Sequence, residues 1–338
     1  MVYFANCHLH SDVSDSFLSP EAIVDIAKEL GHKALVLTDH DTVKGSHRFD
    51  VACRRAGIYS MLGVEFITKG LGTGFHLLGY DFDAEHPAMR ELIDRCSSRH
   101  RERCHLLFEE SLKNGSLRPG VTWQEVLDAF PGNDFYYYTQ VFTVLEKKGI
   151  YEHAEHPQFI KDAFSPPKER EGELEAAIGY FTPDIEECIK VILAAGGVPV
   201  IAHPHNKQEY IEDLIKMGIR GIEVYHPSIL PEERIAYDAL CRERGLYVTG
   251  GTDHAGRIGG FTDLFEKKNK PDDRPASLMP SAMNSSLTTD IPTTPYLALN
   301  FSPAPPVGVN DTISCPRGMT TYQLSSSSCD PSMVLACT

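Results

Sequence analysis

The stretch Asn6-Cys7-His8-Leu9-His10-Ser11-Asp12-Val13-Ser14-Asp15 decides how the rest of the chain is interpreted. Alternate side chains of an extended segment point the same way, so His8 and His10 share one side. With Asp15 on the following loop, two imidazoles and a carboxylate form a donor set that suits zinc, manganese or iron. A His-x-His pair alone is explained equally well by solvated or buried structural histidines.

Further histidines and carboxylates follow other apolar runs of the chain. Seven runs read as strands, most of them followed by a helical pattern, which predicts a parallel, barrel-like α/β architecture. In such barrels the chemistry lies at the carboxyl ends of the strands. Five predicted strand ends carry ligand-type residues: His8 and His10, Asp39 and His40, Glu65, His203, and Asp253 and His254. A metal-dependent active site is therefore the favoured interpretation.

Composition limits the possible partners. The chain has 338 residues, 42% of them hydrophobic, and a formal net charge of -15. This charge argues against a protein that holds nucleic acid by phosphate neutralisation, although bound metals reverse the local field for a small phosphorylated substrate. Nine cysteines without a Cys-x-x-Cys pair indicate free thiols in a reducing compartment. We expect a soluble, cytoplasmic protein with no membrane partner and no stable nucleic-acid complex.

The sequence pattern divides the chain into three parts. We expect a metal-binding barrel over 1–86 and 182–262, interrupted by a helical insertion over 87–181. The tract Phe135-Tyr136-Tyr137-Tyr138 in that insertion is interpreted as packing rather than as a base-stacking platform. Residues 275–338 are rich in Ser, Thr and Pro and have no persistent helical or strand period, and we expect a disordered low-complexity tail over 263–338.

Taken together, the motifs resemble those of a known family. They are His8-Leu9-His10 with Ser14-Asp15, Leu37-Thr38-Asp39-His40-Asp41-Thr42, Gly63-Val64-Glu65, Val200-Ile201-Ala202-His203-Pro204 and Gly251-Thr252-Asp253-His254. The resemblance is to the PHP (polymerase and histidinol phosphatase) superfamily, over residues 1–85 and 182–260, and most closely to its stand-alone phosphoesterases. It implies a distorted (β/α)7 barrel with two or three divalent metal ions: manganese, zinc or iron.

The resemblance also implies a role for individual residues. His8 and His10 would hold a first metal, with Asp253 completing its ligands and Glu65 bridging to a second. His76 and His203 match ligands of the second metal, and Asp15, His40 and His254 would hold a third. Glu65 and Asp253 would be catalytic through the bound metals, which activate a water for attack on phosphorus.

This sequence differs from the family pattern at two places, which limits what the resemblance implies about its site and substrate. His254 directly follows Asp253, whereas relatives commonly place this His two residues after the Asp. Adjacent side chains of an extended segment point to opposite faces, so the third metal is in question. The Arg-Pro-His-like segment that helps related enzymes bind phosphate is replaced by Asp134-Phe135-Tyr136-Tyr137-Tyr138-Thr139. The substrate is therefore not inherited.

Several polar residues have plainer interpretations. His76 alone would more often be a satisfied core histidine, and only the family spacing makes it a ligand. Asp39 and Asp41 are interpreted as orienting His40 or its loop. His205 and His226 are interpreted as supporting or structural. Six further histidines are interpreted as solvated: His47, His86, His100, His105, His153 and His156.

The leading hypothesis is a metal-dependent phosphoesterase that hydrolyses a small phosphorylated metabolite or a nucleotide. One alternative is a nuclease or a polymerase-associated proofreading module, which the acidic charge disfavours. The other is a non-catalytic metal-binding interaction module, because a barrel can keep its ligands after losing activity. Turnover of phosphate esters separates these classes.

Overall fold

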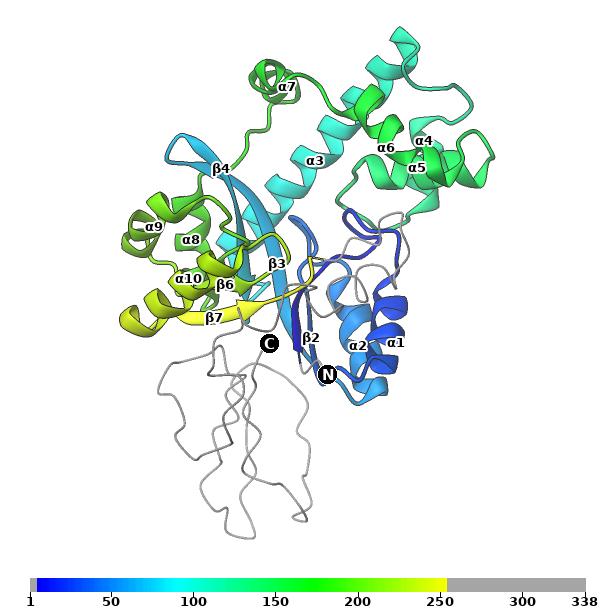
Figure 1. Ribbon diagram of the computed structural model, residues 1–338. Helices are drawn as coiled ribbons and strands as arrows, with labels where there is room; N and C mark the ends of the chain where they lie inside the picture. The colour runs from blue at the N-terminus through cyan, green and yellow to red at the C-terminus, as the bar shows by residue number, and fades with distance from the viewer. Residues whose placement is uncertain (1–4, 254–338) are drawn as a thin grey trace.

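Seven strands form one sheet in chain order in the computed structural model, which describes residues 5–253. The strands are β1 (Ala5–Leu9), β2 (Ala34–Leu37), β3 (Tyr59–Gly70), β4 (Thr73–Tyr80), β5 (Val198–Ile201), β6 (Gly221–Tyr225) and β7 (Tyr247–Gly250). The sheet curls into a nearly closed barrel, as expected from the sequence (Figure 1). The expected tail over 263–338 lies outside the described residues.

One strand departs from the expected parallel arrangement. β1, β2 and β3 are parallel, as are β5, β6 and β7, but β4 is antiparallel to both of its neighbours. The prediction was wrong for β4 because only Leu71 and Gly72 connect it to β3. Both residues have positive φ, 49° and 78°, as in the tight turns that join antiparallel hairpin strands. The hairpin carries Glu65 and His76 into the same region.

The barrel closes between β1 and the segment that follows β7. Asn6 Nδ2 donates to Thr252 Oγ1 at 2.8 Å, and the Asp253 amide donates to the His8 carbonyl at 3.0 Å. At this seam Gly251 passes so close to β1 that an added Cβ would lie 2.3 Å from His8 Cβ. Only glycine fits there, and the close approach brings Asp253 beside His8.

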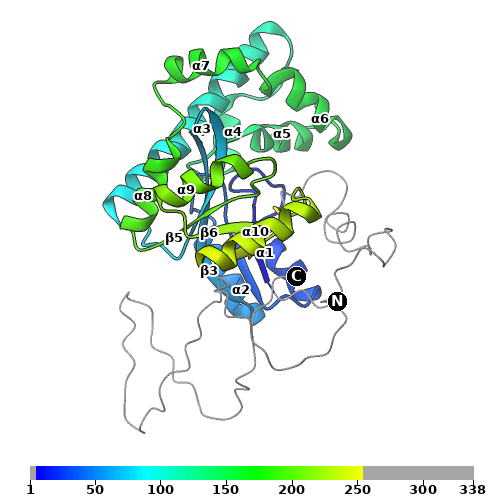
Figure 2. The ribbon, with the colours of Figure 1, turned by 60° about the vertical axis from the view of Figure 1, so that its left-hand side comes forward.

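Helices cover the outside of the sheet. Around the barrel these are α1 (Pro20–Glu29), α2 (Ser46–Ala56), α8 (Ile185–Ala194), α9 (Ile211–Met217) and α10 (Pro231–Arg244). α1 begins as predicted, with Ser19 accepting from the Ala22 amide and Pro20 in the first turn. α1 and α2 lie on one side and α8, α9 and α10 on the other (Figures 1 and 2). None of the helices in residues 5–253 combines the length and apolar character needed to cross a membrane.

A second group of helices lies between β4 and β5. It comprises α3 (Pro87–Asn114), α4 (Trp123–Ala129), α5 (Tyr138–Lys147), α6 (His156–Phe159) and α7 (Glu171–Ile178), with short turns at His153–Glu155, Ile160–Phe164 and Lys168–Arg170. α3 runs from the barrel to α4, α5 and α6, which gather above it (Figure 1). This group has an apolar cluster of its own, in which Phe108 and Phe142 are fully buried. The division of the chain into a barrel and an insertion stays a prediction.

Burial corrects the interpretation of two histidines in this group. His100 and His156 were expected to be solvated, but their exposed fractions are 4% and 5%. His100 Nε2 lies 2.8 Å from Asp41 Oδ2, and the His156 ring packs 4.6 Å from the ring of Phe142. Phe135 and Tyr136 are buried, which confirms that the beginning of the aromatic tract serves packing.

Candidate active site

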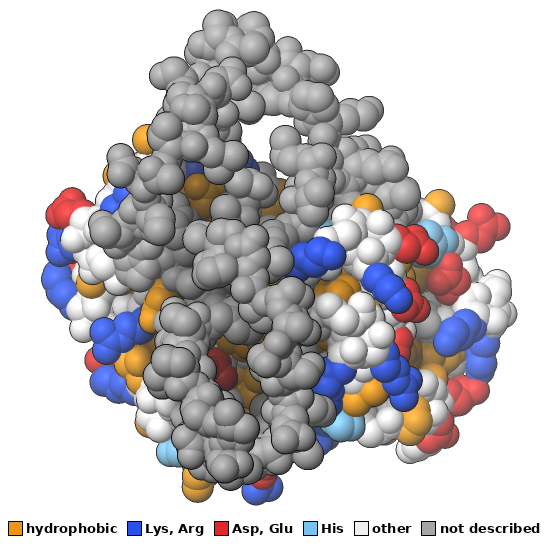
Figure 3. All heavy atoms as spheres, turned by 90° about the horizontal axis from the view of Figure 1, so that it is seen from below, with side chains coloured by type: hydrophobic (Ala, Val, Ile, Leu, Met, Phe, Trp, Pro, Cys, Tyr) orange, Lys and Arg blue, Asp and Glu red, His pale blue; other side chains and the backbone are white. Residues whose placement is uncertain are grey.

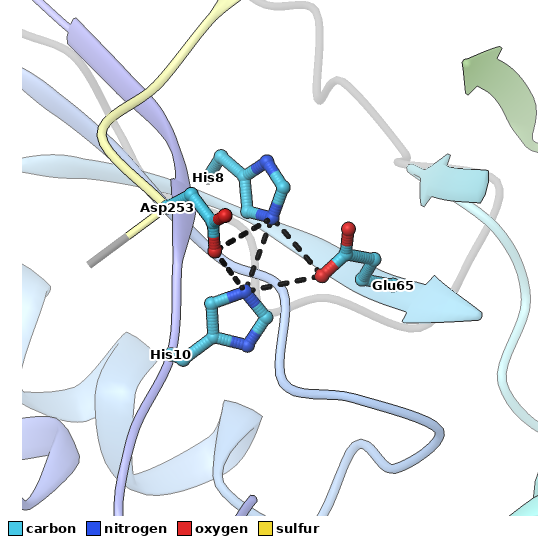
Figure 4. A group of neighbouring side chains, drawn as sticks. All are labelled: His8, His10, Glu65 and Asp253. Atoms are coloured by element: carbon cyan, nitrogen blue, oxygen red, sulfur yellow. Dashed lines mark hydrogen bonds and ion pairs between the residues drawn. The ribbon is translucent and has the colours of Figure 1, made fainter. Parts of the chain in front are cut away.

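Three elements bring four of the predicted site residues together. His8 lies in β1, His10 directly after it, Glu65 in β3, and Asp253 after β7 (Figure 4). His8 Nε2 and His10 Nε2 each lie 3.1 Å from Glu65 Oε2 and 3.1 Å from each other. His10 Nε2 lies 3.2 Å from Asp253 Oδ1. These four side chains form one potential metal-binding group.

Two more groups share residues with the first. One comprises His10, Asp15 and His40, with His10 Nδ1 3.5 Å from Asp15 Oδ1. The other comprises His40, Glu65 and His76, whose nitrogens lie 3.2 Å and 3.0 Å from the Glu65 oxygens. We call the first of these two the Asp15 group and the second the His76 group. The group drawn in Figure 4 is called the Asp253 group.

His203 joins the same cluster, since its Nε2 lies 3.1 Å from Glu65 Oε1. The sequence-predicted site residues within 5–253 therefore all surround or contact Glu65 or its histidine neighbours. The remaining one, His254, lies outside the described residues. The sequence analysis assumed an extended backbone at Asp253, but its φ is 49°, so this residue is not extended.

The residues present fit divalent cations. His8, His10 and Glu65 are completely buried, and Glu65 Oε2 lies within 3.2 Å of three imidazole nitrogens. Yet this oxygen makes no hydrogen bond within residues 5–253. Buried nitrogen and oxygen atoms that converge in this way have the arrangement of a ligand set, because a cation can occupy the point they share. Imidazole and carboxylate donors suit manganese, zinc and iron alike.

Electrostatics support the same interpretation in the metal-free protein. Burial alone would lower the pKa of His10, but the carboxylates of Asp15, Asp253 and Glu65 outweigh it and raise the pKa to about 10. The same balance raises the pKa of His8 well above its ordinary value. Both imidazoles therefore carry a proton that a metal must displace, which makes metal binding dependent on pH.

His40 and Glu65 are shifted in the other direction. Burial, helped by the charge of His10, lowers the pKa of His40 to about 4 although Glu65 opposes it. His40 is thus a neutral imidazole, the form that binds metal. Burial alone would raise the pKa of Glu65, but the surrounding imidazoles, His8 first, hold it well below its usual range. The surrounding imidazoles therefore favour the ionised form of Glu65.

Glu223 supports the cluster from behind, and the sequence analysis missed it. It is completely buried in β6, where its two oxygens lie 3.0 Å and 3.1 Å from His8 Nδ1. Its Oε2 also accepts from the His203 amide at 2.9 Å. A carboxylate on the far nitrogen fixes the imidazole tautomer and leaves Nε2 for the metal. The available signal was a single charged residue within the apolar run Gly221-Ile222-Glu223-Val224-Tyr225.

The Asp39 side chain holds the loop after β1, which is a different loop from that of His40, the one it was expected to orient. It accepts from the Ser11 amide at 2.6 Å, from Ser11 Oγ at 2.7 Å and from Ser14 Oγ at 2.6 Å. Asp41 has a φ of 52° and contacts His100, so it ties the loop after β2 to α3. Neither carboxylate belongs to a metal-binding group in the described part of the chain.

His226 lies at the rim of the cluster. Its Nδ1 accepts from the Ser228 amide at 3.1 Å, so the proton of the neutral ring must sit on Nε2. That nitrogen lies 3.4 Å from Asp253 Oδ2. His226 belongs to none of the metal-binding groups in the described part of the chain. His205 is farther out, paired with Glu233 at 2.8 Å.

Comparison with known proteins agrees with this geometry. The PHP domain matches residues 6–154 of the chain. A 5'-3' exoribonuclease of Haemophilus influenzae is 30% identical over 255 residues, which cover 73% of this chain and 88% of the relative. The chain belongs to the PHP family. A phosphoribosyl 1,2-cyclic phosphate 1,2-diphosphodiesterase of Eggerthella lenta is 26% identical and matches over 75% of this chain and 94% of its own length.

The fold is also shared with a solved structure. A Bifidobacterium adolescentis protein assigned as a metal-dependent phosphoesterase superposes with a TM-score of 0.62 at 23% identity, covering 79% of this chain and 96% of the other. This similarity shows the PHP fold expected from the sequence.

Proposed function

We propose that the protein hydrolyses a small phosphorylated metabolite or a nucleotide at the cluster around Glu65. The observation that carries the proposal is one buried, ionised carboxylate in contact with five imidazoles: His8, His10, His40, His76 and His203. Divalent ions held there would activate a water and neutralise charge on the phosphoryl oxygens. We assign two or three ions to the cluster, because three ligand groups share their residues.

The protein's own residues divide the remaining work. Glu65 holds the histidines in one place and, with Asp253, supplies the anionic ligands. Glu223 orients His8 from the opposite side of the ring. His226 Nε2 lies 3.4 Å from the second carboxylate oxygen of Asp253, at the rim of the cluster. The complete burial of His8, Glu65 and Glu223 strengthens the electrostatic contacts among them.

The size of the substrate is the finer part of the proposal. The Eggerthella lenta relative acts on a cyclic phosphate of a small sugar phosphate, which favours a small substrate. The exoribonuclease relative supports the nuclease alternative. The net charge of -15 weighs against a long nucleic-acid path, and on the face shown in Figure 3 the Lys and Arg side chains of the described residues are interspersed with Asp and Glu.

The cellular location is also a proposal. The cysteines within residues 5–253 form no disulfide, as expected of a protein in a reducing compartment. We therefore place the enzyme in the cytoplasm, as an expectation that localisation of a tagged chain would test.

The test is turnover of a substrate panel with added Mn²⁺, Zn²⁺ or Fe²⁺. The panel contains a nucleoside monophosphate, a 3',5'-bisphosphate, a cyclic sugar phosphate and a 5'-phosphorylated RNA oligonucleotide. We expect metal-dependent release of phosphate from a small ester and loss of that activity in Glu65→Ala. Preference for the oligonucleotide would favour the nuclease alternative. No turnover by a metal-loaded protein would favour the interaction module.

A further inference from the structure

The beginning of α5 reaches the loop that carries Asp15. Thr139 Oγ1 donates to the Asp15 carbonyl at 3.1 Å. Gln140 Nε2 donates to two carbonyls of the same loop, those of Asp12 at 2.9 Å and Ser14 at 2.5 Å. Three backbone acceptors of one short loop are therefore satisfied by two neighbouring side chains that come from the helices between β4 and β5.

These contacts are shielded from water. Thr139 and Gln140 are each 1% exposed, and Asp15 is 6% exposed. A buried carbonyl that loses its donor has no water to replace it, so the loop must move or pay a desolvation penalty. The loop conformation thus depends on side chains more than 120 positions away in the sequence.

The opposite side of the loop is held by the barrel itself, since Asp39 binds the hydroxyls of Ser11 and Ser14. Between these two attachments stands Asp15, whose Oδ1 faces His10 Nδ1 at 3.5 Å. Among the three ligand groups within residues 5–253, only the Asp15 group contains a residue of this loop beyond His10. Release of the loop on the α5 side would therefore change one group and leave the Asp253 and His76 groups in place.

We propose that Thr139 and Gln140 are positioning residues for Asp15, so that α5 determines whether the Asp15 group holds the third metal ion. The inference rests on the proposed function, because it takes the cluster around Glu65 to bind metal. It goes beyond that function in assigning a role in metal occupancy to side chains that are not ligands. Partners of that kind typically change metal affinity by about 10- to 100-fold.

Two variants remove the donors with little change of volume. Thr139→Val deletes the hydroxyl, and Gln140→Met deletes the amide. Gln140 also caps α5 by accepting from the Tyr137 amide at 2.8 Å. Gln140→Glu keeps that acceptor and replaces the donor to Asp12 and Ser14 with a carboxylate oxygen, so weaker binding of the third ion in this variant would not come from loss of the helix cap.

Thr139 and Gln140 each have a control residue in the same group of helices. Thr143 donates to the Thr139 carbonyl within α5, so Thr143→Val removes a hydroxyl that does not reach the loop. Gln124 donates to Asp128 within α4, so Gln124→Met removes an exposed amide. Circular dichroism and thermal unfolding would establish that all five variants are folded.

The measurement is the number of Mn²⁺ ions bound to demetallated full-length protein, obtained from the electron paramagnetic resonance signal of free Mn²⁺ during titration. We expect three ions on the wild type and on both controls. In Thr139→Val, Gln140→Met and Gln140→Glu we expect two ions to bind as before and the third to bind at least about tenfold more weakly.

The possible failures are distinguishable. Unchanged binding of a third ion in Thr139→Val, Gln140→Met and Gln140→Glu would overturn the inference and leave the proposed function intact. A wild type that binds only two ions would also overturn it, because no third ion would then depend on α5. A wild type that binds no ion would contradict the proposed function itself.

Discussion

The strand ends of the barrel and the helices between β4 and β5 bury very different side chains. At the strand ends, His8, His10, Glu65 and Glu223 are completely buried. In the helical group a cluster of buried side chains is aromatic and aliphatic, as at Phe108. Buried charge costs free energy unless it is paired, whereas buried apolar area contributes to stability directly. The barrel end is arranged for chemistry and the helical group for packing.

This difference means that equal numbers of deleted atoms should damage different properties in the two regions. A deletion at the strand ends should reduce turnover and metal binding and leave the fold in place. Removal of apolar atoms from the cluster around Phe108 and Phe142 should lower the free energy of unfolding and leave the folded protein active. The predictions below test that separation.

The largest effect is expected for Glu65→Ala. Loss of the shared anionic ligand removes several kcal/mol of transition-state stabilisation, which corresponds to a decrease in kcat/KM of roughly a thousandfold or more. Phosphate release and bound metal measured on the same sample would check it. The control is Glu85→Ala, whose side chain is 84% exposed. An active, metal-loaded Glu65→Ala protein would break the comparison.

Phe108→Ala should show the opposite behaviour. Removal of a completely buried aromatic ring typically costs about 3–5 kcal/mol, so the unfolding midpoint in urea should fall clearly. At a temperature where the variant is folded, kcat should stay near that of the wild type. Phe181→Ala, at an exposed ring, should leave the midpoint within about 0.5 kcal/mol of the wild type. A catalytic loss without a loss of stability would contradict the prediction.

Glu223→Gln sharpens the comparison within the strand ends. The amide cannot hold the His8 ring as the carboxylate does, so metal affinity should fall by about 10- to 100-fold with little change in the unfolding midpoint. Metal titration of the variant beside Glu232→Gln, at an exposed position of α10, would measure the difference. Equal affinity in the two variants would show that Glu223 only fills space.

The smallest effect concerns acid stability. Burial alone would raise the pKa of Glu233, but hydrogen bonds from the Asn206 amide and His205 outweigh it and lower the pKa to about 2. A carboxyl with a lowered pKa stabilises the fold above its ordinary value of 4.5, and this contribution is lost as the pH falls from 4.5 toward 2.

Unfolding midpoints of the wild type and Glu233→Gln should therefore differ most at neutral pH and approach each other below pH 4.5. The measurement is urea unfolding at several pH values between these limits. A difference that stays constant across the range would show that the carboxylate charge of Glu233 does not contribute.

The sequence predicted the parts that depend on local pattern. The seven strands could be predicted because each is an apolar run bounded by turn signals, and the residues around Glu65 because family motifs mark them. The direction of β4 was missed because it depends on the two residues Leu71 and Gly72 rather than on the strand. The ligand roles themselves, including that of His254, stay predictions.

Other features were missed because distant partners decide them. His100 looks like a solvated residue on a charged helix until Asp41 is brought beside it. Gln140 has no unusual neighbours in the sequence, and only the folded chain shows it against Ser14. Burial of a polar side chain depends on which elements pack together, and no pattern within a single element reports that.

The seam at Gly251 has a consequence for the order in which the site is made during translation. All residues of the Asp15 and His76 groups have been synthesised by the time the ribosome reaches residue 76. The Asp253 group waits for the last segment, because Asp253 reaches His8 only after Gly251 has passed β1. A nascent chain thus carries its shared carboxylate and most of its histidines long before Asp253 is synthesised.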